Sequence, residues 1–179
     1  MATMQDLEDR YKALNEDFNL LTSKKHPAST VQLEEYRSKS GLVITSDFHE
    51  FLTTYGVFIL EVNDTVWPKP EEFSVLPMWK FGYGFFVFGF SQHPDSPEWL
   101  TYNDNFSEEN ARDLGQLFFQ RSGNLYRAYV LRGKITIVYN AFSGDAEEFE
   151  GNIFDFIISE IDKLEADYRK YLKEKQAVE

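Results

Sequence analysis

Residues 126–139 read YRAYVLRGKITIVY, the clearest strand signal in the chain. Apolar and branched residues fill 126–131 and 134–139, and Arg132-Gly133 separates the two runs. Two such runs joined by two residues predict a β-hairpin, because glycine supplies the positive φ that a short turn needs. The stretch therefore makes an antiparallel sheet the starting point for the fold.

Downstream of this hairpin, apolar residues recur at helical spacing. The stripe consists of Ile153, Phe156, Ile157, Ile161, Leu164, Tyr168 and Tyr171 or Leu172. Asn152 is placed to cap the helix, and Glu165 precedes Arg169 by four residues, a spacing that favours an ion pair. We expect a long amphipathic helix that ends near residue 172, followed by a frayed, charged tail over 173–179.

Two further strands are expected upstream of the hairpin. Residues 57–62 are apolar and branched, and they end at the turn-prone pair Asn63-Asp64. Residues 83–90 are almost continuously apolar, which predicts a central strand covered on both faces. A short strand over 99–102 and a brief helix beginning at Ser107 are also expected.

Three helices are expected before these strands. The first spans 4–21, on a stripe that steps by three and four residues: Met4, Leu7, Tyr11, Leu14, Phe18 and Leu21. The second spans 29–41, and the third runs from about residue 46 to Gly56. Candidate N-caps are Thr3 for the first helix, Ser29 or Thr30 for the second and Ser46 or Asp47 for the third.

This order of elements predicts an α+β fold in a single domain, and 179 residues suit one domain. The central sheet is expected to be mostly antiparallel and packed with the N-terminal helices and a long C-terminal helix. We divide the chain into a helix and linker over 1–28, the α+β domain over 29–172 and the tail over 173–179.

Composition narrows the functional classes. The formal net charge of -12 disfavours nucleic acid and anionic lipid as partners, because both are polyanions, and favours a basic protein. The chain has no cysteine, begins with a polar acidic segment and contains no apolar run near the roughly 20 residues that a membrane helix needs. We therefore expect a cytoplasmic protein with no membrane partner.

No catalytic motif was found in the sequence. The three histidines, His26, His49 and His93, are far apart, whereas zinc sites draw three or four close ligands. Neither a phosphate-binding glycine loop nor a nucleophile elbow occurs at the required spacing. We assign no metal, no cofactor and no catalytic residue, and we expect a protein that is not an enzyme.

The segment over 51–110 combines acidic and aromatic residues. It holds nine acids against two lysines, a net charge of -7, together with all three tryptophans. Aromatic anchors ringed by charge are typical of protein-binding surfaces, although each tryptophan could instead belong to the core. The candidate partner-binding residues are Glu61, Asp64, Trp67, Glu71, Glu72, Trp79, Asp95, Glu98, Trp99 and Asp104.

Several short motifs resemble a known family. Leu33-Glu34-Glu35-Tyr36, Asp47-Phe48-His49-Glu50-Phe51-Leu52 and Tyr55-Gly56 resemble the amino-terminal signature of the SUKH superfamily. Gly133-Lys134-Ile135, Glu148-Phe149-Glu150 and Phe154-Asp155-Phe156-Ile157 are similar to its closing hairpin and helix. The resemblance covers roughly residues 29–172.

This resemblance implies an α+β binding module without a catalytic centre. Bacterial members of the superfamily are largely immunity proteins that neutralise a toxin, often a nuclease, whereas fungal members resemble scaffolds for cell-wall signalling. The resemblance thus implies a cognate protein toxin as the partner, and the acidic surface would suit the basic substrate cleft of a nuclease. The alternative that we retain is an intracellular scaffold or regulator with another partner.

Overall fold

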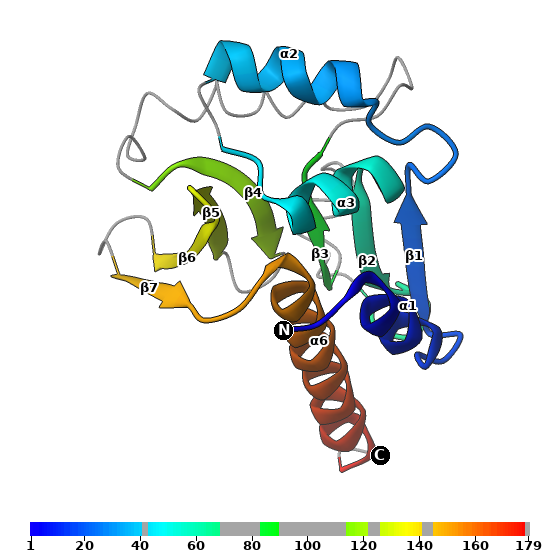
Figure 1. Ribbon diagram of the computed structural model, residues 1–179. Coiled ribbons are helices and arrows are strands. Elements are labelled where there is room, and N and C mark those ends of the chain that lie inside the picture. Colours follow the sequence, from blue (N-terminus) through cyan, green and yellow to red (C-terminus); the bar gives the residue numbers. More distant parts are fainter. Residues whose placement is uncertain (41–42, 69–82, 90–113, 122–125, 141–144, 178–179) are drawn as a thin grey trace.

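The fold is a single antiparallel sheet with helices packed on it (Figure 1). The computed structural model describes residues 1–40, 43–68, 83–89, 114–121, 126–140 and 145–177. The strands are β1 Phe18–Thr22, β2 Phe58–Val62, β3 Gly84–Val87, β4 Gln116–Arg121, β5 Arg127–Leu131, β6 Lys134–Asn140 and β7 Asp145–Phe149. The helices are α1 Met4–Lys12, α2 Thr30–Ser40, α3 Ser46–Thr54 and α6 Ile153–Gln176. The α+β prediction is confirmed.

The sheet has the simplest possible connectivity. Its strand order is β1-β2-β3-β4-β5-β6-β7, and every neighbouring pair is antiparallel. The predicted hairpin is its β5–β6 pair, in which Leu131 lies opposite Lys134. Arg132 and Gly133 have φ values of 52° and 81°, so both turn residues have the positive φ of the hairpin turns that match strand twist.

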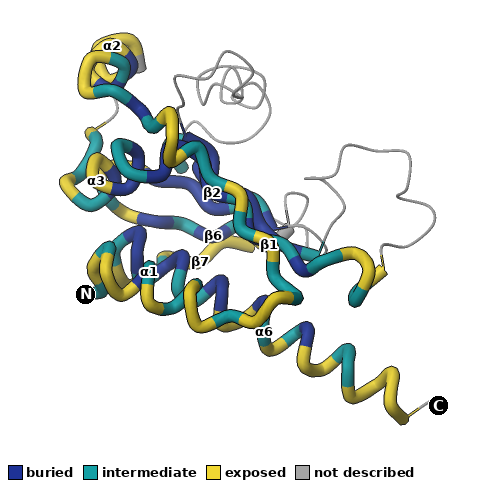
Figure 2. The backbone as a smooth tube through the Cα atoms, turned by 90° about the vertical axis from the view of Figure 1, so that its right-hand side faces the viewer, coloured by how far each residue is buried: buried dark blue, intermediate teal, exposed yellow. Residues whose placement is uncertain are grey.

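Helices α1, α3 and α6 cover one face of the sheet, and α2 lies at one end (Figures 1 and 2). The core between the layers is aromatic. In β4 the pairing register shifts between Leu117 and Phe119, and this bulge lets two consecutive residues face the helices. The rings of Phe118 and Phe119 lie 5.3 and 4.8 Å from that of Phe156 in α6.

Helix α1 is held against α6 by a set of contacts that we call the α1–α6 clasp. The Ala2 amide donates to Asp155 at 2.8 Å, and the Asn152 side-chain amide donates to the Ala2 carbonyl at 2.8 Å. Arg10 donates to Asp162 at 2.7 Å and to Glu165 at 2.6 Å. Separately, Glu8 accepts hydrogen bonds from Lys12 at 2.8 Å and Lys24 at 3.0 Å.

The prediction of one helix over 4–21 was wrong. Helix α1 ends at Lys12, and residues 18–22 form the edge strand β1. The Asn15 side chain accepts a hydrogen bond from the Asp17 amide at 3.2 Å, a local turn that competes with helix. Consequently a strand precedes α2 and α3, which contradicts the expected order of helices first and strands afterwards.

The expected N-caps of α1 and α6 are confirmed. Thr3 and Asn152 cap α1 and α6 through complete capping boxes. The expected cap of α3 was wrong, because its N-cap is Thr45 and Asp47 accepts instead from the Ile153 amide at 3.1 Å. Helix α6 continues to Gln176, past the expected end at residue 172.

The strand expected over 57–62 is confirmed as β2. The strand expected over 83–90 is shorter, because β3 spans Gly84–Val87, but all four of its residues are buried, as a central strand requires. Strands β4 and β7 were not predicted. The expected strand over 99–102, the helix at Ser107 and the helix end at Gly41 lie outside the described residues. Among the helices of the described ranges, none is long and apolar enough to cross a membrane.

Candidate functional site

Three of the ten predicted partner-binding residues lie in the described part of the chain. Glu61 is half-buried in β2, where it pairs with Asn19 of β1 and Gly84 of β3. Asp64 is exposed in the turn that follows β2, and Trp67 is half-buried three residues later. The other seven lie outside the described residues: Glu71, Glu72, Trp79, Asp95, Glu98, Trp99 and Asp104.

Trp67 belongs to an aromatic stack. Its ring centroid lies 3.8 Å from that of Tyr83, with the ring planes 8° apart, and 5.1 Å from that of Tyr171. Tyr171 lies near the end of α6, and Tyr168, one turn earlier, lies 5.8 Å from the indole. The indole of Trp67 therefore packs the turn after β2 against α6. In this turn, Asp64 is the predicted partner-binding residue that is exposed to solvent.

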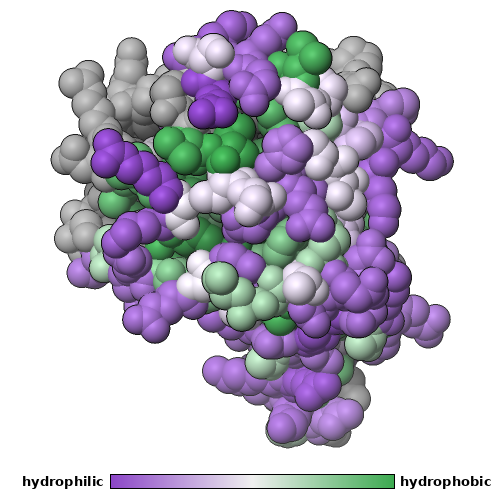
Figure 3. Space-filling model, viewed as in Figure 1, coloured by the Kyte–Doolittle hydropathy of each residue, from purple (hydrophilic) through white to green (hydrophobic). Residues whose placement is uncertain are grey.

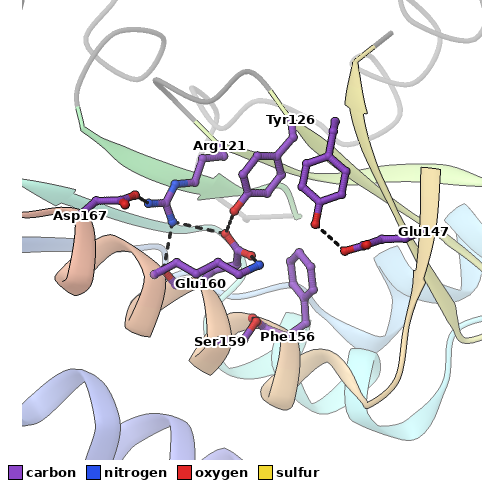
Figure 4. A network of polar contacts seen from close by, with 9 residues as sticks. Arg121, Tyr126, Glu147, Phe156, Ser159, Glu160 and Asp167 are labelled. Carbon is purple, nitrogen blue, oxygen red and sulfur yellow. Dashed lines mark hydrogen bonds and ion pairs between the residues drawn. The ribbon is translucent and has the colours of Figure 1, made fainter. Parts of the chain in front are cut away.

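The strongest polar cluster joins the sheet to α6 (Figure 4). Arg121 of β4 and Glu160 of α6 are 2% and 0% exposed, so both charges are buried. One Arg121 nitrogen donates to the Glu160 carboxylate at 3.3 Å and to the Glu160 carbonyl at 3.1 Å. Its other terminal nitrogen donates to Asp167 at 2.7 Å.

Glu160 has two further donors. The hydroxyl of Tyr126 donates to one carboxylate oxygen, and Lys163 donates to the other at 2.8 Å. Burial and the charge of Glu160 raise the pKa of Tyr126 well above its ordinary value, so this hydroxyl keeps its proton. Because every charge in the network has an internal partner, we interpret it as the structure that fixes α6 on the sheet.

A second acidic group lies on β7 and the residue after it, at the edge of the sheet. Residues 145–148 are all exposed, and the acidic side chains of this segment, which we call the acidic edge, are Asp145, Glu147, Glu148 and Glu150. Glu147 accepts from the Tyr139 hydroxyl, and Lys134 donates to Glu148 at 3.0 Å. Tyr139 itself is 40% exposed, which leaves an aromatic ring beside the acids.

Sequence reasoning missed both groups, although each has a signal. Glu160 falls within the apolar stripe of α6, between Phe156 and Leu164, where a charged residue indicates a buried partner. The acidic edge places four acids in six residues. Figure 3 shows that hydrophilic side chains cover most of the helix-bearing face, with smaller apolar patches among them.

The described residues contain no group of three or more His, Cys, Asp or Glu side chains arranged to hold a metal. Comparison with known proteins found no matching family model, no matching curated protein and no matching solved structure. The resemblance to the SUKH superfamily therefore stays a prediction from the motifs.

Proposed function

We propose that this protein is a non-catalytic binding module that recognises a basic protein, and that this partner is a cognate toxin. The observation that carries the proposal is the acidic edge: four exposed acids in six residues, three on strand β7 and Glu150 directly after it, beside the 40% exposed Tyr139. Aromatic rings next to charge are typical of the residues that dominate binding energy at interfaces.

Charge supports the same proposal. The net charge of -12 is spread over a chain that holds 30 acids and 18 lysines and arginines. Such a field accelerates encounter with a basic protein and repels polyanions. A nuclease toxin carries a basic cleft for its substrate, so an acidic inhibitor would be drawn to the surface that it has to block. An immunity protein of this kind would act in the cytoplasm, where such a toxin meets nucleic acid.

Asp64 and the seven predicted residues outside the described ranges belong to the same proposal as a second contact region. Among them Asp64 is described, and it would add one acidic contact in the exposed turn after β2. The acidic edge and this region are separable by mutation, because one lies on β7 and the other follows β2.

The test is co-expression of the tagged protein with the product of a neighbouring toxin gene, followed by titration calorimetry for affinity and stopped-flow fluorescence for the association rate. We expect a complex whose association slows as salt rises. The triple variant E147Q/E148Q/E150Q should weaken binding by about tenfold or more. Its control is E34Q/E35Q/E50Q, which changes the net charge equally at exposed helical acids. Equal weakening by both variants, or association unaffected by salt, would contradict the proposal.

A further inference from the structure

We propose that the partner contributes an extended, basic segment that pairs with β7 as an eighth strand of the sheet. This inference rests on the proposed function and specifies how the acidic edge would be used. Strand addition is a common mode of peptide recognition, in which backbone hydrogen bonds supply affinity and alternate side chains supply specificity.

The position of β7 makes such pairing possible. It is the last strand in the sheet order, and within the described residues its only strand neighbour is β6. In an antiparallel ladder, alternate residues of an edge strand direct their amide and carbonyl groups away from the sheet. The exposure of residues 145–148 shows that the described elements leave these side chains uncovered.

The side chains of β7 define the chemistry of the segment. Phe149 faces α6, because its ring lies 5.3 Å from that of Phe156. Since side chains alternate along a strand, Glu147 shares this face and Glu148 lies on the other. An added strand with Lys or Arg on both faces would therefore meet an acid on each. On the α6 side, the exposed ring of Tyr139 adds a surface for a cation or an apolar side chain.

The opposite edge of the sheet does not offer the same complementarity. Strand β1 has the sequence FNLLT, which contains no charged residue. A second copy of β7 is also an unsuitable occupant, because antiparallel pairing of two copies would place acid opposite acid. The charges of β7 thus discourage self-pairing and select a basic strand.

The absence of cysteine in the chain permits a clean trapping experiment. Ala146→Cys places one thiol on β7, and Ala166→Cys places one on the exposed side of α6 as a matched control. The probe is a synthetic peptide of lysine and threonine, about nine residues long, in which lysines occupy both odd and even positions so that both faces of the strand carry a positive charge. It carries one cysteine activated as a thionitrobenzoate disulfide. Attack by the protein thiolate forms the mixed disulfide and releases thionitrobenzoate, which is followed by absorbance.

We expect trapping about tenfold faster at position 146 than at 166, because pairing raises the effective concentration of the peptide. The rate should rise and fall with period two as the peptide cysteine is moved. In the Ala146→Cys protein, the additional changes E148Q and E150Q should remove most of the difference in trapping rate between positions 146 and 166. A peptide of glutamate and threonine should be trapped at equal rates at the two positions. Amides of β7 should exchange more slowly in the trapped product.

Equal rates at the two cysteines, absence of the period of two, or faster disulfide dimerisation of Ala146→Cys than peptide capture would overturn the inference. The outcome is separable from that of the proposed function. If a toxin binds the peptide-blocked Ala146→Cys protein as tightly as the unmodified protein, binding stands and strand addition fails. If period-two trapping occurs but no toxin binds, the edge accepts basic strands and the proposed function fails.

Discussion

Glu160 offers the most direct test of the buried network. Replacing it with leucine removes the acceptor shared by Arg121, Tyr126 and Lys163 and leaves a buried guanidinium with fewer partners. Breaking a buried ion pair by removing one member costs about 3–5 kcal/mol. Arg121 keeps its bonds to the backbone carbonyl of residue 160 and to Asp167, so the lower end applies, and we expect about 3 kcal/mol.

The assay is urea denaturation followed by far-ultraviolet circular dichroism and tryptophan fluorescence. In a domain of this size, about 3 kcal/mol corresponds to a fall in Tm of roughly 6–12 °C. Tyr126→Phe removes a single hydrogen bond to a charged carboxylate and should cost about 1.5–3 kcal/mol. The double variant Arg121→Met/Glu160→Leu should be more stable than Glu160→Leu alone, because an apolar pair has no stranded charge.

The double-mutant cycle also defines the result that would refute this reasoning. If the losses from Arg121→Met and Glu160→Leu simply add, the two side chains are not energetically coupled. A loss below about 1 kcal/mol for Glu160→Leu would lead to the same conclusion. In either case the network would not be what fixes α6 on the sheet.

Three further predictions concern other parts of the fold. Gly89→Ala should destabilise the protein by more than about 2 kcal/mol, measured by urea denaturation, because its Cβ would lie 1.7 Å from the Gly56 carbonyl oxygen. Trp67→Ala should speed amide exchange in the last turns of α6, because the stack that holds them is lost; unchanged exchange would show that the stack is dispensable. Hydrogen bonds from its two lysine partners lower the pKa of Glu8 to about 2, so its stabilising effect is complete above about pH 4.5 and disappears as pH falls towards 2. Glu8→Gln should flatten the stability profile in that window, and an unchanged slope there would contradict this assignment.

The elements that sequence predicted are those whose signals are local. The β5–β6 hairpin was specified by its two-residue turn, and α6 by its cap and apolar stripe. Strand β1 was mistaken for helix because Phe18 and Leu21 continue a helical spacing, while alternation of Phe18, Leu20 and Thr22 fits a strand equally well. Pairing with β2 decides between the two, and pairing is not visible in a single segment.

The missed parts of the candidate site depend on tertiary contacts. The sequence of β7 resembles an exposed acidic loop, because only Phe149 packs inwards. Pairing with β6 is what holds the segment in an extended conformation. Arg121 and Glu160 meet across 39 positions in sequence, so their partnership follows from how α6 crosses the sheet. Charge alone indicates that the acidic partner-binding candidates lie at the protein surface. Which of these acids lie close to one another depends on the fold.

The α1–α6 clasp has a consequence for folding during synthesis. Each strand after β1 pairs with the strand that precedes it in the sequence, so the sheet can grow one strand at a time as the chain emerges. The partner of α1 is the exception, because α6 is translated last among the described elements. At about 5–20 residues per second, α1 waits roughly seven to thirty seconds for it. Until then α6 does not cover the aromatic face of the nascent sheet, and exposed apolar surface of this kind favours aggregation.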